Sequence, residues 1–176
     1  IPKTGIGKWS PEEGLSIEVP NIDDKEDYSS IYWWNDSLLV TRSGRVFSWN
    51  GKELIPFYRT GAYIRRLVTT QSGHLHVLGN NGVHRMANLG EPALTYVGEG
   101  GRNKVFDLVD YRNQKVVGTD EGLCFLKDGE IIPLVLGDTL IQRPVYELLV
   151  DREQGLWLGT DRGVLRFTPG KGWLHY

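Results

Sequence analysis

The chain has 176 residues, with 40% hydrophobic residues, 24% charged residues and a formal net charge of −2 at pH 7. These values are typical of a globular protein and leave no basic surface of the kind that binds nucleic acid or an anionic membrane. The single cysteine, Cys124, excludes an internal disulfide and any metal site with several cysteines.

The beginning of the chain and its lack of long apolar runs predict an excised fragment. The chain opens Ile1-Pro2-Lys3, without Met and without the pattern of a signal peptide. No apolar run approaches the roughly 20 residues that cross a bilayer. We therefore expect any targeting segment or membrane anchor to lie outside this sequence, with no membrane contact by the fragment itself.

A glycine recurs at a nearly constant interval from one end of the chain to the other. In chain order the spacings are 39, 38, 40 and 41 residues, for Gly5, Gly44, Gly82, Gly122 and Gly163. A second position repeats with the last two intervals, at His76, Val116 and Trp157, and so does a third, at Thr70, Asp110 and Asp151. Three independent positions with one spacing indicate a tandem repeat of about 40 residues.

Each repeat divides into four short strands separated by Gly, Asp, Asn or Pro. The first two predicted strands of the chain, Lys3–Trp9 and Ser16–Val19, form only the second half of such a unit. The first full repeat follows with four strands, Ile31–Trp34, Leu38–Thr41, Val46–Trp49 and Leu54–Tyr58. The last repeat reads Tyr146–Val150, Leu156–Gly159, Val164–Phe167 and Trp173–Tyr176. No segment has a sustained 3.6-residue apolar period, so we expect almost no helix.

Four short antiparallel strands in each repeat predict the blade of a β-propeller. The predicted fold is therefore all-β: four full blades and an N-terminal half blade, as a fragment of a larger propeller. The predicted limits are residues 1–19 for the half blade and 20–60, 61–100, 101–141 and 142–176 for the blades. The four glycines at 44, 82, 122 and 163 should occupy equivalent hairpin turns, because Gly readily adopts positive φ.

The segment Asp151–Phe167, DREQGLWLGTDRGVLRF, resembles the two-component regulator propeller repeat. That repeat has an acidic turn, Leu-Trp-Ile-Gly-Thr, a Gly-Leu turn and an aromatic residue. The matching positions here are Asp151, Leu156, Trp157, Gly159, Thr160, Gly163, Val164 and Phe167. The third repeat keeps Asp110, Gly118, Thr119, Gly122 and Leu123 but has Val116 at the tryptophan position, and the second repeat has His76 there. The resemblance weakens before about residue 60.

Repeats of this family occur in the periplasmic sensor regions of bacterial hybrid histidine kinases and of some diguanylate cyclases. The resemblance therefore implies a non-catalytic ligand-recognition segment of a signal-transduction protein, located in the periplasm as part of a membrane-anchored parent. Its signal would be a small molecule or a glycan, bound by residues that the sequence does not identify. The alternative is a propeller enzyme or lectin that acts on polysaccharide. Carboxylates clustered with an exposed Trp or Tyr near the channel would favour the alternative.

Candidate chemical groups are few, and we predict no catalytic residue, metal or cofactor. His74 and His76 would share a face of one strand, and His84 would lie beside His76 across the hairpin. Three clustered histidines could bind zinc or copper, but His76 fills a packing position and no carboxylate accompanies the group. A packing role is therefore the favoured interpretation.

The acidic pairs and the glycine-rich segment also favour structural roles. The acidic pairs Asp23-Asp24, Asp120-Glu121 and Asp151-Glu153 fall in turns, where Asp commonly caps its own backbone. Gly98–Gly101 has no following Lys-Ser/Thr and no helix, so it reads as a loop between blades. Cys124 lies in an apolar strand and should behave as a small hydrophobe.

The predicted blades leave two apolar faces open, one on the half blade and one on the blade that ends at Tyr176. We expect these faces to dock on the remainder of the parent chain or on another copy. Trp157 should be buried between blades, and its truncation to Ala should cost about 3–5 kcal/mol.

Overall fold

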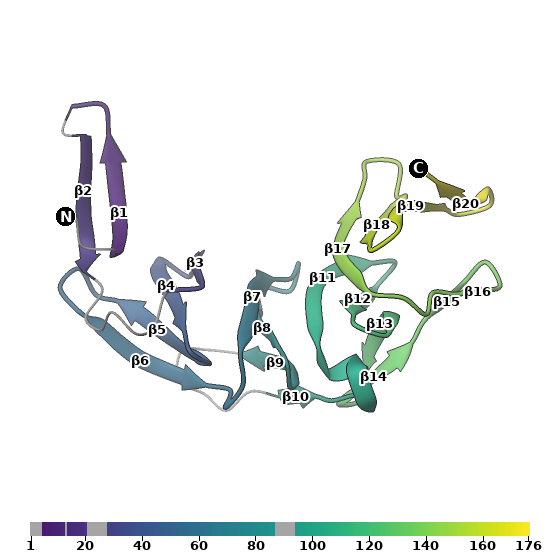
Figure 1. The fold of residues 1–176 in the computed structure, drawn as a ribbon, viewed down its shortest axis with the longest axis horizontal. Helices are drawn as coiled ribbons and strands as arrows, with labels where there is room; N and C mark the ends of the chain where they lie inside the picture. Colours follow the sequence, from purple (N-terminus) through teal and green to yellow (C-terminus); the bar gives the residue numbers. More distant parts are fainter. Residues whose placement is uncertain (1–4, 13, 21–27, 87–93) are drawn as a thin grey trace. The chain divides into compact units, whose positions relative to one another are not determined.

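The fold was analysed in a computed structural model that describes residues 5–12, 14–20, 28–86 and 94–176. The chain forms two compact units, Ile1–Ile64 and Arg65–Tyr176, and each is described by itself. Among the described residues almost all regular structure is β-strand, as the sequence predicts. Figure 1 shows the strands in chain order.

The first unit contains a two-stranded and a four-stranded antiparallel sheet. The two-stranded sheet pairs β1 (Gly5–Ser10) with β2 (Gly14–Pro20), where the sequence predicts half a blade. Blade 1 has the order β3 (Ser30–Trp34), β4 (Ser37–Arg42), β5 (Arg45–Trp49) and β6 (Leu54–Arg59). The predicted residues Lys3, Asp23 and Asp24 lie outside the described residues.

The second unit contains three four-stranded sheets (Figure 1). The first of them, blade 2, begins at Ile64, the last residue of the first unit. Blade 2 consists of β7 (Ile64–Thr69), β8 (Leu75–Gly79), β9 (Gly82–Met86) and β10 (Leu94–Tyr96). Blade 3 consists of β11 (Val105–Tyr111), β12 (Gln114–Thr119), β13 (Gly122–Lys127) and β14 (Glu130–Pro133). Blade 4 consists of β17 (Val145–Val150), β18 (Leu156–Thr160), β19 (Gly163–Thr168) and β20 (Gly172–His175).

Two short features between these blades were not predicted. A hairpin of β15 (Val135–Leu136) and β16 (Thr139–Leu140) connects blades 3 and 4. One turn of 3-10 helix, Gly100–Asn103, lies in the loop between blades 2 and 3. The strands of each blade are otherwise joined in sequence order. We call the first strand of each blade its inner strand and the last its outer strand. The exact blade limits remain predictions.

The repeated glycines occupy equivalent places, as predicted. Their φ angles are positive, at 72°, 104°, 132° and 110° for Gly44, Gly82, Gly122 and Gly163. A Cβ atom at any of them would collide with a backbone carbonyl oxygen, that of Ala62, Tyr96, Ile141 and Tyr176 in the same order. Gly44 differs in one respect, because it lies within the turn between the paired residues Arg42 and Arg45. Only glycine satisfies both the φ angle and the close approach.

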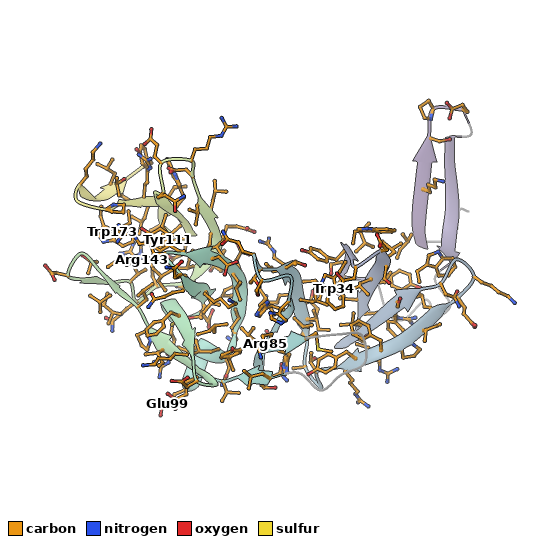
Figure 2. The ribbon with its side chains drawn as sticks, turned by 180° about the vertical axis from the view of Figure 1, so that it is seen from behind. Trp34, Arg85, Glu99, Tyr111, Arg143 and Trp173 are labelled. Atoms are coloured by element: carbon orange, nitrogen blue, oxygen red, sulfur yellow. The ribbon has the colours of Figure 1, made fainter. Side chains whose placement is uncertain are left out.

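The core of the second unit lies between successive sheets. One apolar cluster joins blades 2 and 3 and contains Leu78, Val83, Tyr96, Val105, Leu108, Val117, Cys124 and Ile131. A second cluster joins blades 3 and 4 and includes Val116, Leu123, Leu148, Leu156, Leu158 and Phe167. Tyr111 belongs to this second cluster and Trp173 packs against it, and the two lie close together in Figure 2. Face-to-face packing of twisted sheets in sequence order is the architecture of a β-propeller.

Candidate functional site on the inner strands

A β-bulge occurs at the same place in the inner strands of blades 3 and 4. In blade 3 the register shifts between Val105 and Asp107, which leaves Phe106 without a paired residue. In blade 4 it shifts between Val145 and Glu147, which leaves Tyr146 as the extra residue. A bulge turns the extra side chain away from the regular alternation, and bulges often re-aim side chains at binding sites. The bulges therefore display Phe106 and Tyr146 on neighbouring strands.

The bulge residues form an aromatic row with an arginine from blade 2. Arg65, Phe106 and Tyr146 are each the second residue of the first strand of a blade, so they occupy equivalent positions of three repeats. The guanidinium carbon of Arg65 lies 4.6 Å from the ring centre of Phe106. The rings of Phe106 and Tyr146 meet edge to face with centres 5.0 Å apart. Arg65 also donates a hydrogen bond from Nε to Asn80 Oδ1, at 3.0 Å, and Tyr146 is exposed.

The next position of the same repeats forms a charged row. Arg66 bonds Glu147 through two nitrogens, at 2.8 and 2.6 Å, and lies 2.8 Å from Asp107 Oδ1. Hydrogen bonding to Glu147 raises the pKa of Arg66 above its ordinary value, while burial opposes the shift. The buried carboxylate of Asp107 also accepts the backbone N–H groups of Leu108 and Leu148, at 2.9 and 2.8 Å. Glu147 remains largely exposed beside Tyr146.

The opposite ends of the same three inner strands surround a pocket of about 320 Å³. Its apolar walls come from Val68, Leu108, Val109, Leu149 and Val150, and its polar groups include Thr70, Gln71 and Asp110. A second hollow of about 360 Å³ shares Gln71 and Asp110 and adds Ser72, Arg112, Asn113, Lys115 and Gln154. Apolar walls with a few polar groups at the mouth are typical of small-molecule sites.

The charged and aromatic rows lie side by side on the inner strands, and the carboxylates of the charged row already have Arg66 as a partner. The Asp107 and Glu147 carboxylates both contact Arg66, so neither is set apart as a proton donor. The exposed ring of Tyr146 offers an aromatic face, and the exposed carboxylate of Glu147 offers acceptor oxygens that also accept from Arg66. We name these six residues, Arg65, Arg66, Phe106, Asp107, Tyr146 and Glu147, the inner-strand cluster.

The predicted grouping of the three histidines is wrong. His76 pairs with Arg85, which is labelled in Figure 2, whereas His84 pairs with Val77. Adjacent pairs in a hairpin project to opposite faces, so His76 and His84 do not converge. His74 precedes β8 and its Nδ1 lies 2.9 Å from Ser72 Oγ. Among the residues that the structure describes, no group of three or more His, Cys, Asp or Glu side chains could hold a metal ion.

The acidic turn residues have the structural roles that the sequence favours. Asp151 Oδ1 accepts the backbone N–H groups of Glu153 and Gly155, which closes its own turn. Hydrogen bonding from Trp157 lowers the pKa of Asp151 to about 2.

The glycine loop and the Asp120-Glu121 turn contact each other. Glu121 accepts the backbone N–H of Gly101 at 2.6 Å, and Lys104 Nζ lies 2.9 Å from Asp120 Oδ2. The Gly101 N–H, which a phosphate-binding loop would donate to its ligand, therefore already donates to the Glu121 carboxylate. Cys124 is buried in an apolar cluster, where burial raises the pKa of its thiol.

The prediction that Trp157 is buried between blades is wrong for this chain. Its side chain is only partly buried, on the face of blade 4 that points away from blade 3. There it stacks on Tyr176, with ring centres 5.4 Å apart. Its Nε1 donates to Asp151 Oδ2 at 2.7 Å, and the Arg166 guanidinium lies 5.2 Å from its ring. The equivalent residues His76 and Val116 are fully buried. The repeat position of His76, Val116 and Trp157 therefore belongs to the core only in a blade whose face is covered by the following blade.

Sequence reasoning missed the inner-strand cluster. It considered none of the six residues as site residues. The 40- and 41-residue frame of the sequence could not have found them, because it aligns Arg66 with Phe106 and Glu147 and thus differs by one residue from the observed rows.

No family model matches the sequence, and no curated protein matches it. Solved structures match over nearly the whole chain at low identity. One is a virginiamycin B lyase from Staphylococcus aureus, with 11% identity over 97% of this chain and a TM-score of 0.71. Two others are extracellular domains from B. thetaiotaomicron. The domain from a putative one-component system has 18% identity, 94% coverage and a TM-score of 0.64. The domain from a putative hybrid two-component system has 15% identity, 99% coverage and a TM-score of 0.67.

These likenesses agree with the observed sheets and define the fold as that of a β-propeller. The chain spans 61% of the lyase and 23% and 26% of the two extracellular domains. Similarity at this identity concerns the fold, because one propeller fold supports many functions. In the described part of the chain, no helix is long and apolar enough to cross a membrane.

Proposed function

We propose that this chain is a non-catalytic, ligand-recognising segment of the sensory propeller of a bacterial two-component signalling protein. Two observations support the proposal. The repeat at Asp151–Phe167 resembles the two-component regulator propeller repeat, and extracellular domains of putative hybrid two-component systems are among the similar structures. A membrane-anchored parent with a kinase or cyclase output, and a periplasmic location of this segment, belong to the same proposal.

The inner-strand cluster is the single observation that carries the recognition role. Three repeats contribute equivalent residues to it, and two matching bulges display its aromatic rings. The Arg66 guanidinium is fixed by two carboxylates, so the surface beside Tyr146 and Glu147 is pre-organised. Pre-organised groups reduce the entropy lost on binding.

The ligand that fits this surface is a small molecule or a glycan. An exposed aromatic face packs on an apolar ring face, and a carboxylate beside it accepts hydrogen bonds from hydroxyl groups. The pocket at the other end of the same strands offers a second contact for a longer ligand. The proposal includes no cofactor and no metal.

A binding screen tests the proposal. The chain is titrated calorimetrically with a panel of small organic acids, monosaccharides and oligosaccharides. For a ligand that binds, Tyr146→Ala should weaken affinity at least about tenfold, because one good aromatic contact is worth roughly 1.4 kcal/mol or more. Tyr63→Ala, which removes an exposed tyrosine of the first unit, is the matched control and should leave affinity unchanged. Equal affinity of the Tyr146→Ala variant and the parent chain for every ligand would reject this site.

The second candidate is a propeller enzyme or lectin acting on polysaccharide. The exposed Tyr146 beside two carboxylates is the observation that favours it. Product analysis after incubation with polysaccharides separates the possibilities. Cleavage products that disappear in a Glu147→Gln variant would identify an enzyme, whereas unmodified bound glycan would identify a lectin or a sensor.

A further inference from the structure

The turns that join the first and second strands of blades 2, 3 and 4 line one polar hollow of about 360 Å³, which we name the turn hollow. Blade 3 contributes four residues to it, whereas Gln71 and Ser72 come from blade 2 and Gln154 comes from blade 4. Every residue of this lining has a polar or charged side chain. A hollow of this kind, built by three repeats, can hold the polar group of a ligand.

The turn hollow contains one more cation than anion. Its anion, Asp110, already has partners, because Lys115 Nζ lies 3.5 Å from Oδ1 and Oδ2 accepts the backbone N–H of Gln71 at 2.6 Å. Arg112 is exposed, and its guanidinium carbon lies 5.7 Å from the ring centre of Tyr111. In the part of the chain that the structure describes, no carboxylate pairs with Arg112. Its positive charge is therefore available to an anionic ligand.

The backbone at Arg112 adds a second, independent observation. The β11–β12 hairpin closes with a two-residue turn, in which Arg112 and Asn113 have φ angles of 49° and 64°. Turns of this kind favour Asn, Asp or Gly, because both residues need positive φ. Asn113 meets this preference, but Arg112 holds a long side chain on a backbone conformation that costs free energy. Such strain at the edge of a hollow points to a role for the side chain.

The corresponding turns of blades 2 and 4 are built differently. Residues 70–74 and 151–155 form longer turns, each closed by hydrogen bonds between its own backbone groups. The residue with positive φ is Gly73 in the first turn and Gln154 in the second. Among the three turns, a charged residue with positive φ therefore occurs only at Arg112.

An apolar pocket adjoins the turn hollow. This pocket of about 320 Å³ shares Gln71 and Asp110 with the hollow, and its aliphatic walls include Val68, Val109 and Val150. One ligand can therefore place a charged group in the hollow and a hydrocarbon chain in the pocket, where apolar surface is removed from water.

We propose that the turn hollow binds the carboxylate group of a small acid whose hydrocarbon chain lies in the adjoining pocket. Arg112 forms the ion pair, Lys115 adds positive charge, and the side-chain amides of Asn113 and Gln154 donate hydrogen bonds. The site is distinct from the inner-strand cluster, so the inference does not depend on which ligand that cluster recognises.

A titration with straight-chain acids tests the site. Hexanoate is added to the full chain in a calorimeter, and hexanamide and hexylamine serve as the uncharged and cationic probes of the same length. Hexanoate should bind and the other two should not, because only the carboxylate complements Arg112. Butanoate should bind about tenfold more weakly than hexanoate, since each buried methylene contributes about threefold to affinity.

Arg112→Asn is the decisive variant. Asn favours the positive φ that this turn requires, so the variant should fold and should keep or raise Tm. It should weaken hexanoate binding at least about tenfold, because a charge-assisted pair is lost. A merely structural role for Arg112 would instead leave the affinity for hexanoate unchanged.

Two further variants are the controls. Arg152→Asn removes an exposed cation that lies outside the turn hollow but in the neighbouring turn of blade 4, and it should leave the affinity unchanged. Tyr146→Ala, in the inner-strand cluster, should also leave it unchanged.

The proposal would be overturned by any of three results: no binding of hexanoate, equal binding of hexanamide, or equal hexanoate affinity of Arg112→Asn and the parent chain. A loss in Arg152→Asn as large as that in Arg112→Asn would identify unspecific attraction by charge. A loss confined to Tyr146→Ala would place the acid at the inner-strand cluster. Either of these two outcomes would overturn the proposal as well.

Discussion

Blades 3 and 4 have the same strand order, nearly the same register and an inner-strand bulge at the same place, yet they bury different surfaces. Blade 3 has a neighbouring sheet on both faces, so Leu123 and Val116 belong to the core. Blade 4 is covered on one face, and the equivalent Val164 and Trp157 contact solvent. The repeat therefore determines the sheet, whereas the neighbour determines which of its residues form a core.

The largest difference between the two blades is expected at their equivalent aliphatic residues. Leu123→Ala should lower the free energy of unfolding by about 2–5 kcal/mol, because it opens a cavity between blades 3 and 4. Val164→Ala should cost less than about 1 kcal/mol, since its side chain already contacts water. Urea denaturation of both variants measures the two changes. Equal losses would show that the outer face of blade 4 is covered in solution.

His76 occupies the position of Trp157 in blade 2, on a face that is covered by blade 3 and from which water should be excluded. The ring is fully buried, its Nδ1 lies 3.1 Å from the carbonyl oxygen of His74, and Nε2 has no hydrogen-bond partner among the described residues. Burial lowers the pKa of His76 to about 4, with the backbone bond to His74 opposing and Lys115 and Arg85 reinforcing the shift. Protonation therefore disfavours the folded state.

The folded pKa of His76 lies below its unfolded value of 6.5, so its contribution to stability is complete above pH 6.5 and is lost as the pH falls towards 4. Between pH 7.5 and pH 4.5 the loss should be about 2–3 kcal/mol. His76→Phe should remove this part of the pH dependence in urea titrations, whereas His74→Gln should retain it. An unchanged profile in His76→Phe would mean that water reaches the ring.

The amount of structure that the sequence could predict differs between these features. The glycine spacing predicted the hairpins, because a positive φ and a close backbone contact leave only glycine at these positions. His84 was predicted to lie beside His76, but it pairs with the next residue, Val77. A register difference of one residue moves a side chain to the opposite face of the hairpin. The inner-strand cluster depends on bulges at Phe106 and Tyr146, and no residue type marks those bulges in advance.

The acidic residues of the inner strands should show a smaller difference between the blades. Asp107→Asn replaces a carboxylate that accepts two backbone N–H groups and contacts Arg66, so we expect a loss of about 2–3 kcal/mol. Glu147→Gln should cost less than about 1 kcal/mol, because its side chain is exposed and its ion pair is screened by solvent. Thermal unfolding at low and high salt provides the comparison, with salt reducing only the contribution of Glu147. A loss for Glu147→Gln as large as that for Asp107→Asn would show that both carboxylates are covered.

Trp157 gives a small expected effect and the most direct test of what an uncovered repeat position contributes. Its ring stacks on Tyr176, lies near the Arg166 guanidinium and donates to Asp151, but its side chain is only partly buried. Trp157→Ala should therefore cost about 1–2 kcal/mol, below the roughly 3–5 kcal/mol of a fully buried tryptophan, because part of its area is never removed from water. Trp157→Phe separates the contributions, since it keeps most of the stacking and removes the hydrogen bond to Asp151. Urea denaturation of the three proteins gives both differences. A loss above about 3 kcal/mol for Trp157→Ala would mean that another sheet already covers the ring in solution, and blade 4 would then not differ from blade 3.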